Sequence, residues 1–98
     1  MSGLLFEWSP AKADSNRRKH GVSFQEAMTV FADPISRTIP DPDHSFEEER
    51  YLTMGRAQSQ RLLVVIHTDR DDRIRIISAR LANRSEQKQY ESRSEKTH

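Results

Sequence analysis

The longest apolar run, Leu62–Ile66, restricts the fold of this chain more than any other feature. A short unbroken apolar run is typical of a central strand that is covered on both faces. Apolar residues make up only 34% of the 98-residue sequence and charged residues 32%, so the chain can build one small core. We therefore expect a single domain at residues 1–91, followed by a polar, disordered tail at 92–98.

Four other segments have the composition of strands. Arg50–Gly55 alternates weakly before the apolar run, and after a polar turn at Asp69–Asp72 the chain returns as Arg73–Arg80. Together with the apolar run, these two segments predict an antiparallel meander, because short turns join antiparallel neighbours. Leu4–Trp8 and Ile35–Ile39 are predicted as two short strands earlier in the chain.

The signals for a first helix are clear. Ser9 is a typical N-cap residue with Pro10 at the first helical position, and Gly21 suits the left-handed stop that follows a helix ending near Lys19. Polar residues recur in this helix at every fourth position and are predicted to share one face. They are Lys12, Asn16 and His20.

Two further helices are predicted from their starts. Ser23–Glu26 has the pattern of a capping box and opens the second helix, and Asn83–Glu86 opens the third, with Tyr90 able to pack back onto the core. The second helix carries an apolar stripe of the kind that lies on a sheet. The stripe consists of Phe24, Ala27, Met28 and Phe31.

The predicted order of elements, β-α-α-β-β-β-β-α, is that of a small α+β domain. We expect an antiparallel sheet with the two N-terminal helices on one face and a C-terminal helix. The chain has no cysteine, which excludes disulfides, thiolate zinc sites and thiol nucleophiles. Because no apolar run approaches the roughly 20 residues of a membrane span and no export signal is visible, we expect a soluble cytoplasmic protein.

Charge is segregated along the chain although the net charge is only +1. Residues 41–49 include five acidic residues and no lysine or arginine, whereas residues 50–84 include eight arginines against three aspartates. One arginine-rich region in a nearly neutral chain is compatible with local phosphate binding, but it falls short of a general nucleic-acid coat.

Three histidines inside the predicted domain are candidates for chemistry: His20, His44 and His67. Cleavage of RNA without a metal requires a base for the 2′-hydroxyl, an acid for the leaving 5′-oxygen, and fixed positive charge for the transition state. Histidine, glutamate and lysine can fill the first two roles, and arginine or lysine can fill the third.

Each of these histidines also has a structural interpretation. His20 and its neighbour Lys19 stand in the last turn of a helix, where cations favour the helix dipole. His67 ends a buried strand, where a hydrogen-bonded core histidine is the usual case. His44 follows Asp43 close to three glutamates, but the spacing of a metal site such as HExxH is absent. We therefore predict no metal and no cofactor.

The arginines of the last predicted strand differ in their positions. Arg73 and Arg75 alternate with isoleucines, which is typical of a half-exposed strand face. Arg80 instead stands where the strand ends beside a helix start, a common place for site residues.

Four ordered segments of the sequence resemble the signature segments of the BrnT family of toxins. They are FEWSPAKADSNRRKHGVSFQEAMTVFADP, DPDHSFEEERYLTMG, RLLVVIHT and RIRIISARLANRSEQKQYE, and together they span nearly all of residues 5–91. The resemblance implies a RelE-like fold and the ribonuclease toxin of a type II toxin–antitoxin pair, which blocks translation. It also implies a BrnA-like antitoxin that masks the toxin and carries the DNA-binding segment that represses their shared operon, so that operator DNA is contacted only through the antitoxin.

The resemblance also implies a set of site residues, carried over where the segments match. They are Lys19 and His20 from KHG, His44 and Glu49 from HSFEEER, and Arg80 from IISAR. Glu49 or His44 is the expected proton-transfer group, Arg80 and Lys19 are the expected phosphate clamps, and His20 positions the substrate or caps its helix. The acidic loop has an alternative use as a dock for a basic segment of the antitoxin.

Three functions remain in competition at this point. The first is a metal-independent endoribonuclease that leaves a 2′,3′-cyclic phosphate, and the second is a non-catalytic module that acts only through a protein partner. The third, a DNA-binding regulator, is the weakest, because no helix-turn-helix pattern is visible and the helices carry too few arginines to fill a major groove. Growth arrest by this chain alone, relieved by a substitution of Arg80, would separate the first two.

Overall fold

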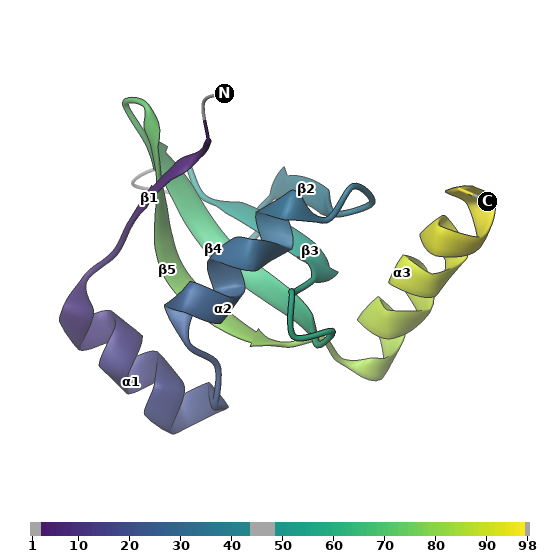
Figure 1. Ribbon diagram of the computed structural model, residues 1–98, viewed down its shortest axis with the longest axis horizontal. Helices are drawn as coiled ribbons and strands as arrows, with labels where there is room; N and C mark the ends of the chain where they lie inside the picture. Colours follow the sequence, from purple (N-terminus) through teal and green to yellow (C-terminus); the bar gives the residue numbers. More distant parts are fainter. Residues whose placement is uncertain (1–2, 44–48, 98) are drawn as a thin grey trace.

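The structure, a computed structural model that describes residues 3–43 and 49–97, contains a five-stranded sheet with the strand order β1-β5-β4-β3-β2 (Figure 1). The strands are β1 (Leu5–Glu7), β2 (Arg37–Pro40), β3 (Tyr51–Arg56), β4 (Leu62–Arg70) and β5 (Arg73–Leu81). The predicted apolar run therefore forms most of β4, the central strand of the sheet.

The helices are α1 (Pro10–His20), α2 (Phe24–Met28), which continues as the 3-10 helix η1 (Thr29–Ala32), and α3 (Arg84–Thr97). The order of strands and helices confirms the α+β prediction. The local signals also act as expected, because Ser9 Oγ accepts a hydrogen bond from the Lys12 amide and Gly21 ends α1 with a φ of 69°. None of the described helices is long and apolar enough to cross a membrane.

The direction of β1 corrects the prediction of a wholly antiparallel sheet. β2 to β5 are antiparallel to their neighbours, but β1 pairs in parallel with β5, with Phe6 opposite Ile74. The alternation of residues within a three-residue strand carries no information on direction. No hairpin turn joins β1 to β5, which is the last strand of the chain, so the rule that applies to neighbouring strands does not apply here.

Helices cover the two faces of the sheet unequally. On the side of α1 and α2, Leu63 and Val65 join a core with Phe24, Val30 and Ile76. On the other side, a smaller cluster packs under α3, and it contains Met54, Leu62, Val64, Ala82 and Tyr90. Figure 1 shows α2 in front of the sheet, α1 at the lower left beside it and α3 off to the right. Much of the second face therefore has no helix over it.

Two helices differ from their predicted form. The stripe of the second helix was expected to bury Met28, but the helix tightens into η1 at Thr29, so that Val30 is fully buried and Met28 is 36% exposed. We expected a disordered tail beyond Glu91, whereas α3 continues to Thr97 and Arg93 donates a long hydrogen bond to the Ile35 carbonyl. The contact with Ile35 lies outside the reach of local sequence patterns.

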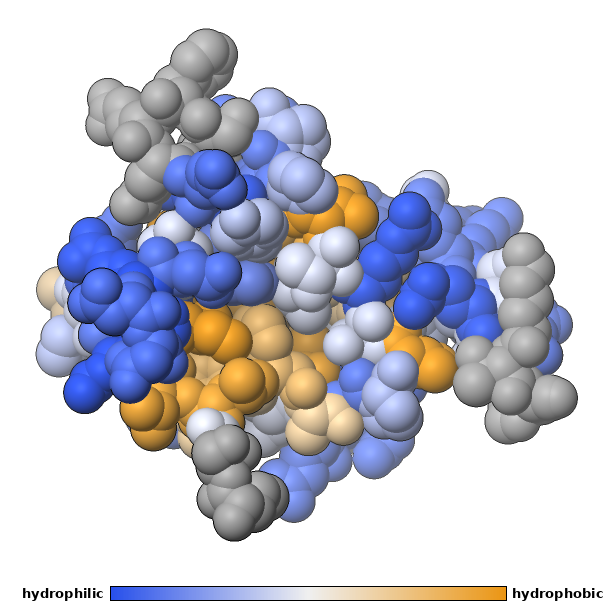
Figure 2. All heavy atoms as spheres, turned by 90° about the horizontal axis from the view of Figure 1, so that it is seen from above, coloured by the Kyte–Doolittle hydropathy of each residue, from blue (hydrophilic) through white to orange (hydrophobic). Residues whose placement is uncertain are grey.

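Some apolar side chains stay on the surface. Leu4 is 58% exposed, Leu5 49% and Ile39 38%. Seen from above, apolar side chains gather in one region and are bordered by hydrophilic ones (Figure 2).

Candidate active site

One face of the sheet is lined with arginines. We call it the open face: the side turned away from α1 and α2, of which α3 covers one end. Side chains alternate between the faces of a strand, so residues paired with Met54, Val64 or Thr68 lie on this side. The arginines that the register places here are Arg37, Arg56, Arg70, Arg73, Arg75 and Arg80, of which Arg56 lies against Tyr90 of α3.

A bulge in β5 brings two of these arginines to the same face. Arg75 and Arg80 are five residues apart, an odd number that places them on opposite faces of a regular strand. The register shifts between Ile66 and His67, however, and leaves Ile77 as the extra residue of β5. Arg75 then pairs with Thr68 and Arg80 with Val64, which are four residues apart on β4 and share a face.

Arg80 is held by the first turn of α3. Its Nη1 and Nη2 donate to the two carboxylate oxygens of Glu86 at 2.8 and 2.9 Å, and Nη1 also donates to the Leu81 carbonyl at 3.2 Å. These bonds from Arg80 lower the pKa of Glu86 despite partial burial, and they raise the pKa of Arg80. The pair therefore stays charged throughout the physiological range, with the Arg80 side chain 40% exposed.

A second acidic residue opposes two arginines at the other end of the face. The Glu7 carboxylate of β1 lies 3.1 Å from Arg75 Nη1 and 3.9 Å from Arg73 Nη1. Arg73 Nε also lies 3.9 Å from Asp72 Oδ1, so two carboxylates oppose these two guanidinium groups and leave no excess of positive charge between them.

Glu49 lies just before β3, at the end of the sheet nearer Arg75 than Arg80. The backbone carbonyl of Glu49 accepts a hydrogen bond from Thr68 Oγ1 at 2.6 Å, and Thr68 pairs with Arg75. Its exposed carboxylate accepts the Tyr51 hydroxyl at 2.7 Å, and this bond raises the pKa of Tyr51. The Tyr51 ring pairs with and stacks on His67, so this carboxylate is held on the helix side of the sheet and not on the open face of Arg75. From the sequence, Arg75 had only a structural interpretation.

The predicted residues do not form one tight cluster. Arg80 pairs with Val64 of β4, and His67, three residues further along β4, pairs with Tyr51. Glu49 lies two residues beyond Tyr51 in the same direction. It therefore stands five residues from Arg80 along the strand direction, or about 16 Å at the usual rise of a strand. His44 lies outside the described residues, so its prediction has no counterpart in the structure.

Lys19 and His20 lie at the edge of the sheet rather than on the open face. They end α1 and line a pocket of about 190 Å³ with Ile77 and Ser78 of β5. Ser78 pairs with Ile66 and so shares the face of Arg80, two residues further along the strand. Lys19 and His20 thus approach the Arg80 end of β5 from the strand edge.

Asn16 fixes α1 against this strand edge. The side chain is buried, its Nδ2 donates to the carbonyls of Ala79 and Val22 at 2.8 and 2.9 Å, and its Oδ1 accepts the Ala79 amide at 3.1 Å. The sequence had placed Asn16 on the face of Lys12 and His20 but had given no reason for its burial.

The structural interpretation of His67 is confirmed. His67 is 4% exposed, its Nε2 is 2.7 Å from Thr53 Oγ1, and its ring packs against Phe31 and Tyr51. Burial lowers the pKa of His67 to about 4, against a smaller opposing effect of Asp69. A neutral, buried imidazole on the helix side of the sheet is not placed to transfer protons to a substrate on the open face.

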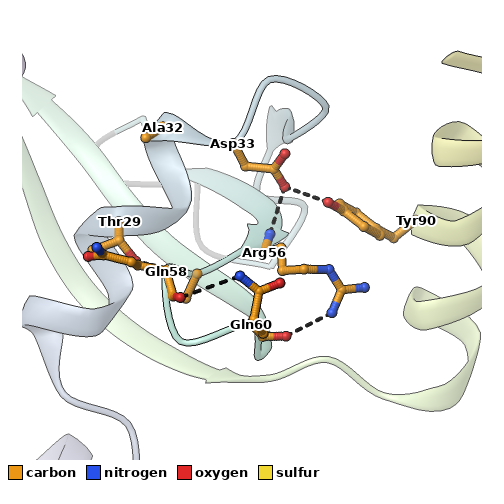
Figure 3. Close-up of a pocket in the computed structure, with 8 residues that line it drawn as sticks. Thr29, Ala32, Asp33, Arg56, Gln58, Gln60 and Tyr90 are labelled. Carbon is orange, nitrogen blue, oxygen red and sulfur yellow. Dashed lines mark hydrogen bonds between the residues drawn. The ribbon is translucent and has the colours of Figure 1, made fainter. Parts of the chain in front are cut away.

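The pocket in Figure 3 lies where α3 packs against η1 and β3, and its polar residues have structural roles. It has a volume of about 570 Å³, and Asp33, Arg56 and Tyr90 are among its lining residues. Asp33 Oδ2 accepts the Tyr90 hydroxyl and the Arg56 amide, both at 2.7 Å, and the Arg56 guanidinium lies 5.0 Å from the centre of the Tyr90 ring. These groups satisfy one another and fasten α3 to η1 and β3, which confirms that Tyr90 packs back onto the domain.

The described side chains provide no cluster of three or more histidine, cysteine or acidic groups that could hold a metal ion. The fold and the open face therefore define a small α+β domain whose most concentrated chemistry is a surface of arginines suited to phosphates.

The comparisons with known proteins identify the family. The profile described as "Ribonuclease toxin, BrnT, of type II toxin-antitoxin system" matches residues 8–86. The chain belongs to this family of ribonuclease toxins. The crystal structure of the Brucella abortus ribonuclease toxin BrnT is similar, with 19% sequence identity and a TM-score of 0.65 over 84% of this chain and 100% of that chain. At this identity the similarity shows the fold alone. No curated protein matches the sequence.

Proposed function

We propose that this chain is a metal-independent endoribonuclease that binds RNA across the open face, cleaves it to leave a 2′,3′-cyclic phosphate, and so inhibits translation in the cytoplasm. The observation that carries the proposal is the row of arginines on a face that the described helices leave largely uncovered, in a member of a ribonuclease toxin family. Guanidinium groups bind phosphates in bidentate geometry, and they stay charged at any physiological pH.

The roles of the residues follow from their positions along the face. Arg80, with Lys19 at the neighbouring strand edge, binds substrate phosphate at one end. At the other end Arg75 stabilises the charge that develops on the reacting phosphate. Glu49, with an exposed carboxylate, or His44 acts as the proton-transfer group. His20, beside Lys19, positions the substrate.

The cognate partner in this proposal is a BrnA-like antitoxin that covers the open face. The arginines offer it charge complementarity, and Leu5 and Ile39, exposed and in register with open-face residues, offer apolar contacts. Operator DNA would then be contacted through the antitoxin.

Incubating the purified chain with RNA in excess EDTA tests the proposal. We expect cleavage to continue, the products to carry 2′,3′-cyclic phosphate ends, and Arg80→Ala to lower the rate by about 10²–10³. Added antitoxin should stop the reaction. Loss of cleavage on chelation with recovery on Mg²⁺ would refute the metal-independent site. A chain that cuts no RNA but still binds its partner would be the non-catalytic module instead.

A further inference from the structure

Arg80 keeps part of its hydrogen-bonding capacity free. The two N–H groups at the outer end of its guanidinium go to Glu86, and the second N–H of Nη1 goes to the Leu81 carbonyl. Within the described chain, neither Nε nor the remaining N–H of Nη2 has an acceptor. Those two N–H groups point in parallel and form the second fork of the planar guanidinium, which matches two oxygens of a phosphate.

A second arginine–glutamate pair in the same molecule shows the contrast. Arg61 gives its Nε and Nη2 to Glu26 at 2.8 and 2.6 Å, and its Nη2 also donates to the Gly21 carbonyl. In that pair the side fork is consumed, whereas in Arg80 it is left over. Both glutamates are the third residue of a helix, and their side chains are similarly exposed, 16% for Glu26 and 19% for Glu86.

Glu86 is itself fixed by the start of α3. Its Oε1 accepts the Asn83 amide at 2.8 Å, and its own amide donates to Asn83 Oδ1 at 2.8 Å, which completes a reciprocal capping box. The same Oε1 also accepts from Arg80 Nη1. The orientation of the guanidinium is therefore tied to the end of a helix instead of depending on a flexible surface contact.

We propose that Glu86 is a positioning residue, which holds Arg80 through its end fork so that the side fork faces the phosphate of bound RNA. This inference rests on the proposed function of Arg80. In this role Glu86 stays bound to Arg80 when RNA binds. A carboxylate that competed with the phosphate would instead have to leave Arg80 before RNA could bind.

Glu86→Gln tests the proposal, because glutamine at this position keeps the capping box but loses the charge and one acceptor oxygen. We expect kcat/KM for RNA cleavage to fall by about 10-fold, mainly through a raised KM, because Arg80 then binds the substrate phosphate without its bidentate geometry. In the Arg80→Ala background the same substitution should have no further effect, because nothing is left to position. Glu26→Gln is the matched control for a lost arginine–glutamate pair at a helix start and should cleave at the wild-type rate per folded molecule.

Three results would overturn the inference. If Glu86→Gln cleaves faster and binds RNA more tightly, Glu86 is a competitor of the substrate. If Glu86→Gln and Glu26→Gln lose activity equally and in proportion to their folded fraction, Glu86 is only structural. If Arg80→Ala slows cleavage but Glu86→Gln does not, the positioning role fails while the function of Arg80 stands. Wild-type cleavage by Arg80→Ala would refute both together.

Discussion

The buried His67 should make the stability of this protein depend on pH between neutrality and about pH 5. Its ring is 4% exposed and, among the described residues, its Nδ1 is the one buried side-chain nitrogen or oxygen without a hydrogen-bond partner. The partner of Nε2, Thr53 Oγ1, also lies 2.7 Å from Thr38 Oγ1. A proton added at Nδ1 would thus be a buried donor without an acceptor, next to two aromatic rings.

The sign and size follow from the two pKa values. In the unfolded chain His67 titrates near its ordinary 6.5, whereas burial lowers its pKa in the folded protein to about 4. Between these values the unfolded chain binds a proton that the folded chain refuses, so stability is greatest above pH 6.5 and falls as the pH drops toward 4. The full loss is about 3 kcal/mol, and about 2 kcal/mol of it is reached at pH 5.

Urea unfolding between about pH 5 and pH 7 measures this loss, with His67→Gln as the test variant and His20→Gln as the matched control. The lowered pKa values of Glu26, Asp33 and Glu86 also cost stability in acid, but at lower pH, as these carboxylates take up protons. For wild type and His20→Gln, the free energy of unfolding should therefore fall with decreasing pH at close to the slope expected for one bound proton. For His67→Gln this slope should be much smaller. Equal slopes for wild type and His67→Gln would refute the argument.

Two further predictions concern the contacts that hold the helices. Tyr90→Phe removes the hydroxyl that donates to Asp33 and should cost about 1.5–3 kcal/mol in urea unfolding, with cleavage per folded molecule unchanged. Tyr51→Phe, whose hydroxyl bonds the exposed Glu49, should cost far less stability, and an equal cost would contradict a special role for the contact of Tyr90 with Asp33. Asn16→Ala leaves three buried backbone groups without their partner and should cost about 3 kcal/mol or more. The isosteric Asn16→Asp should be comparably costly, since it loses the donor that faces two carbonyls, and a thermal midpoint at the wild-type value would show that water replaces the amide.

Local signals predicted the elements of this fold well. The N-caps and the glycine stop act within a few residues, so they could be found in the sequence alone. The contacts that organise the elements are long-range: Asn16 bonds Ala79 across 63 residues, and Tyr90 bonds Asp33 across 57. Neither an apolar period nor a turn motif encodes such a pair, and for this reason the burial of Asn16 and the full length of α3 were missed.

The candidate site shows a further limit of patterns that assume a regular strand. Strict alternation along β5 separates Arg75 from Arg80, so only one of them can face a bound substrate in a regular sheet. The bulge at Ile77 changes this, because one extra residue brings both arginines to the open face. The family segment IISAR identifies Arg80 as a candidate site residue. Arg75 becomes a candidate only through the register of β5, which places both arginines on the face turned away from α1 and α2. The positive surface of this toxin therefore depends on an irregularity of the backbone as much as on its arginines.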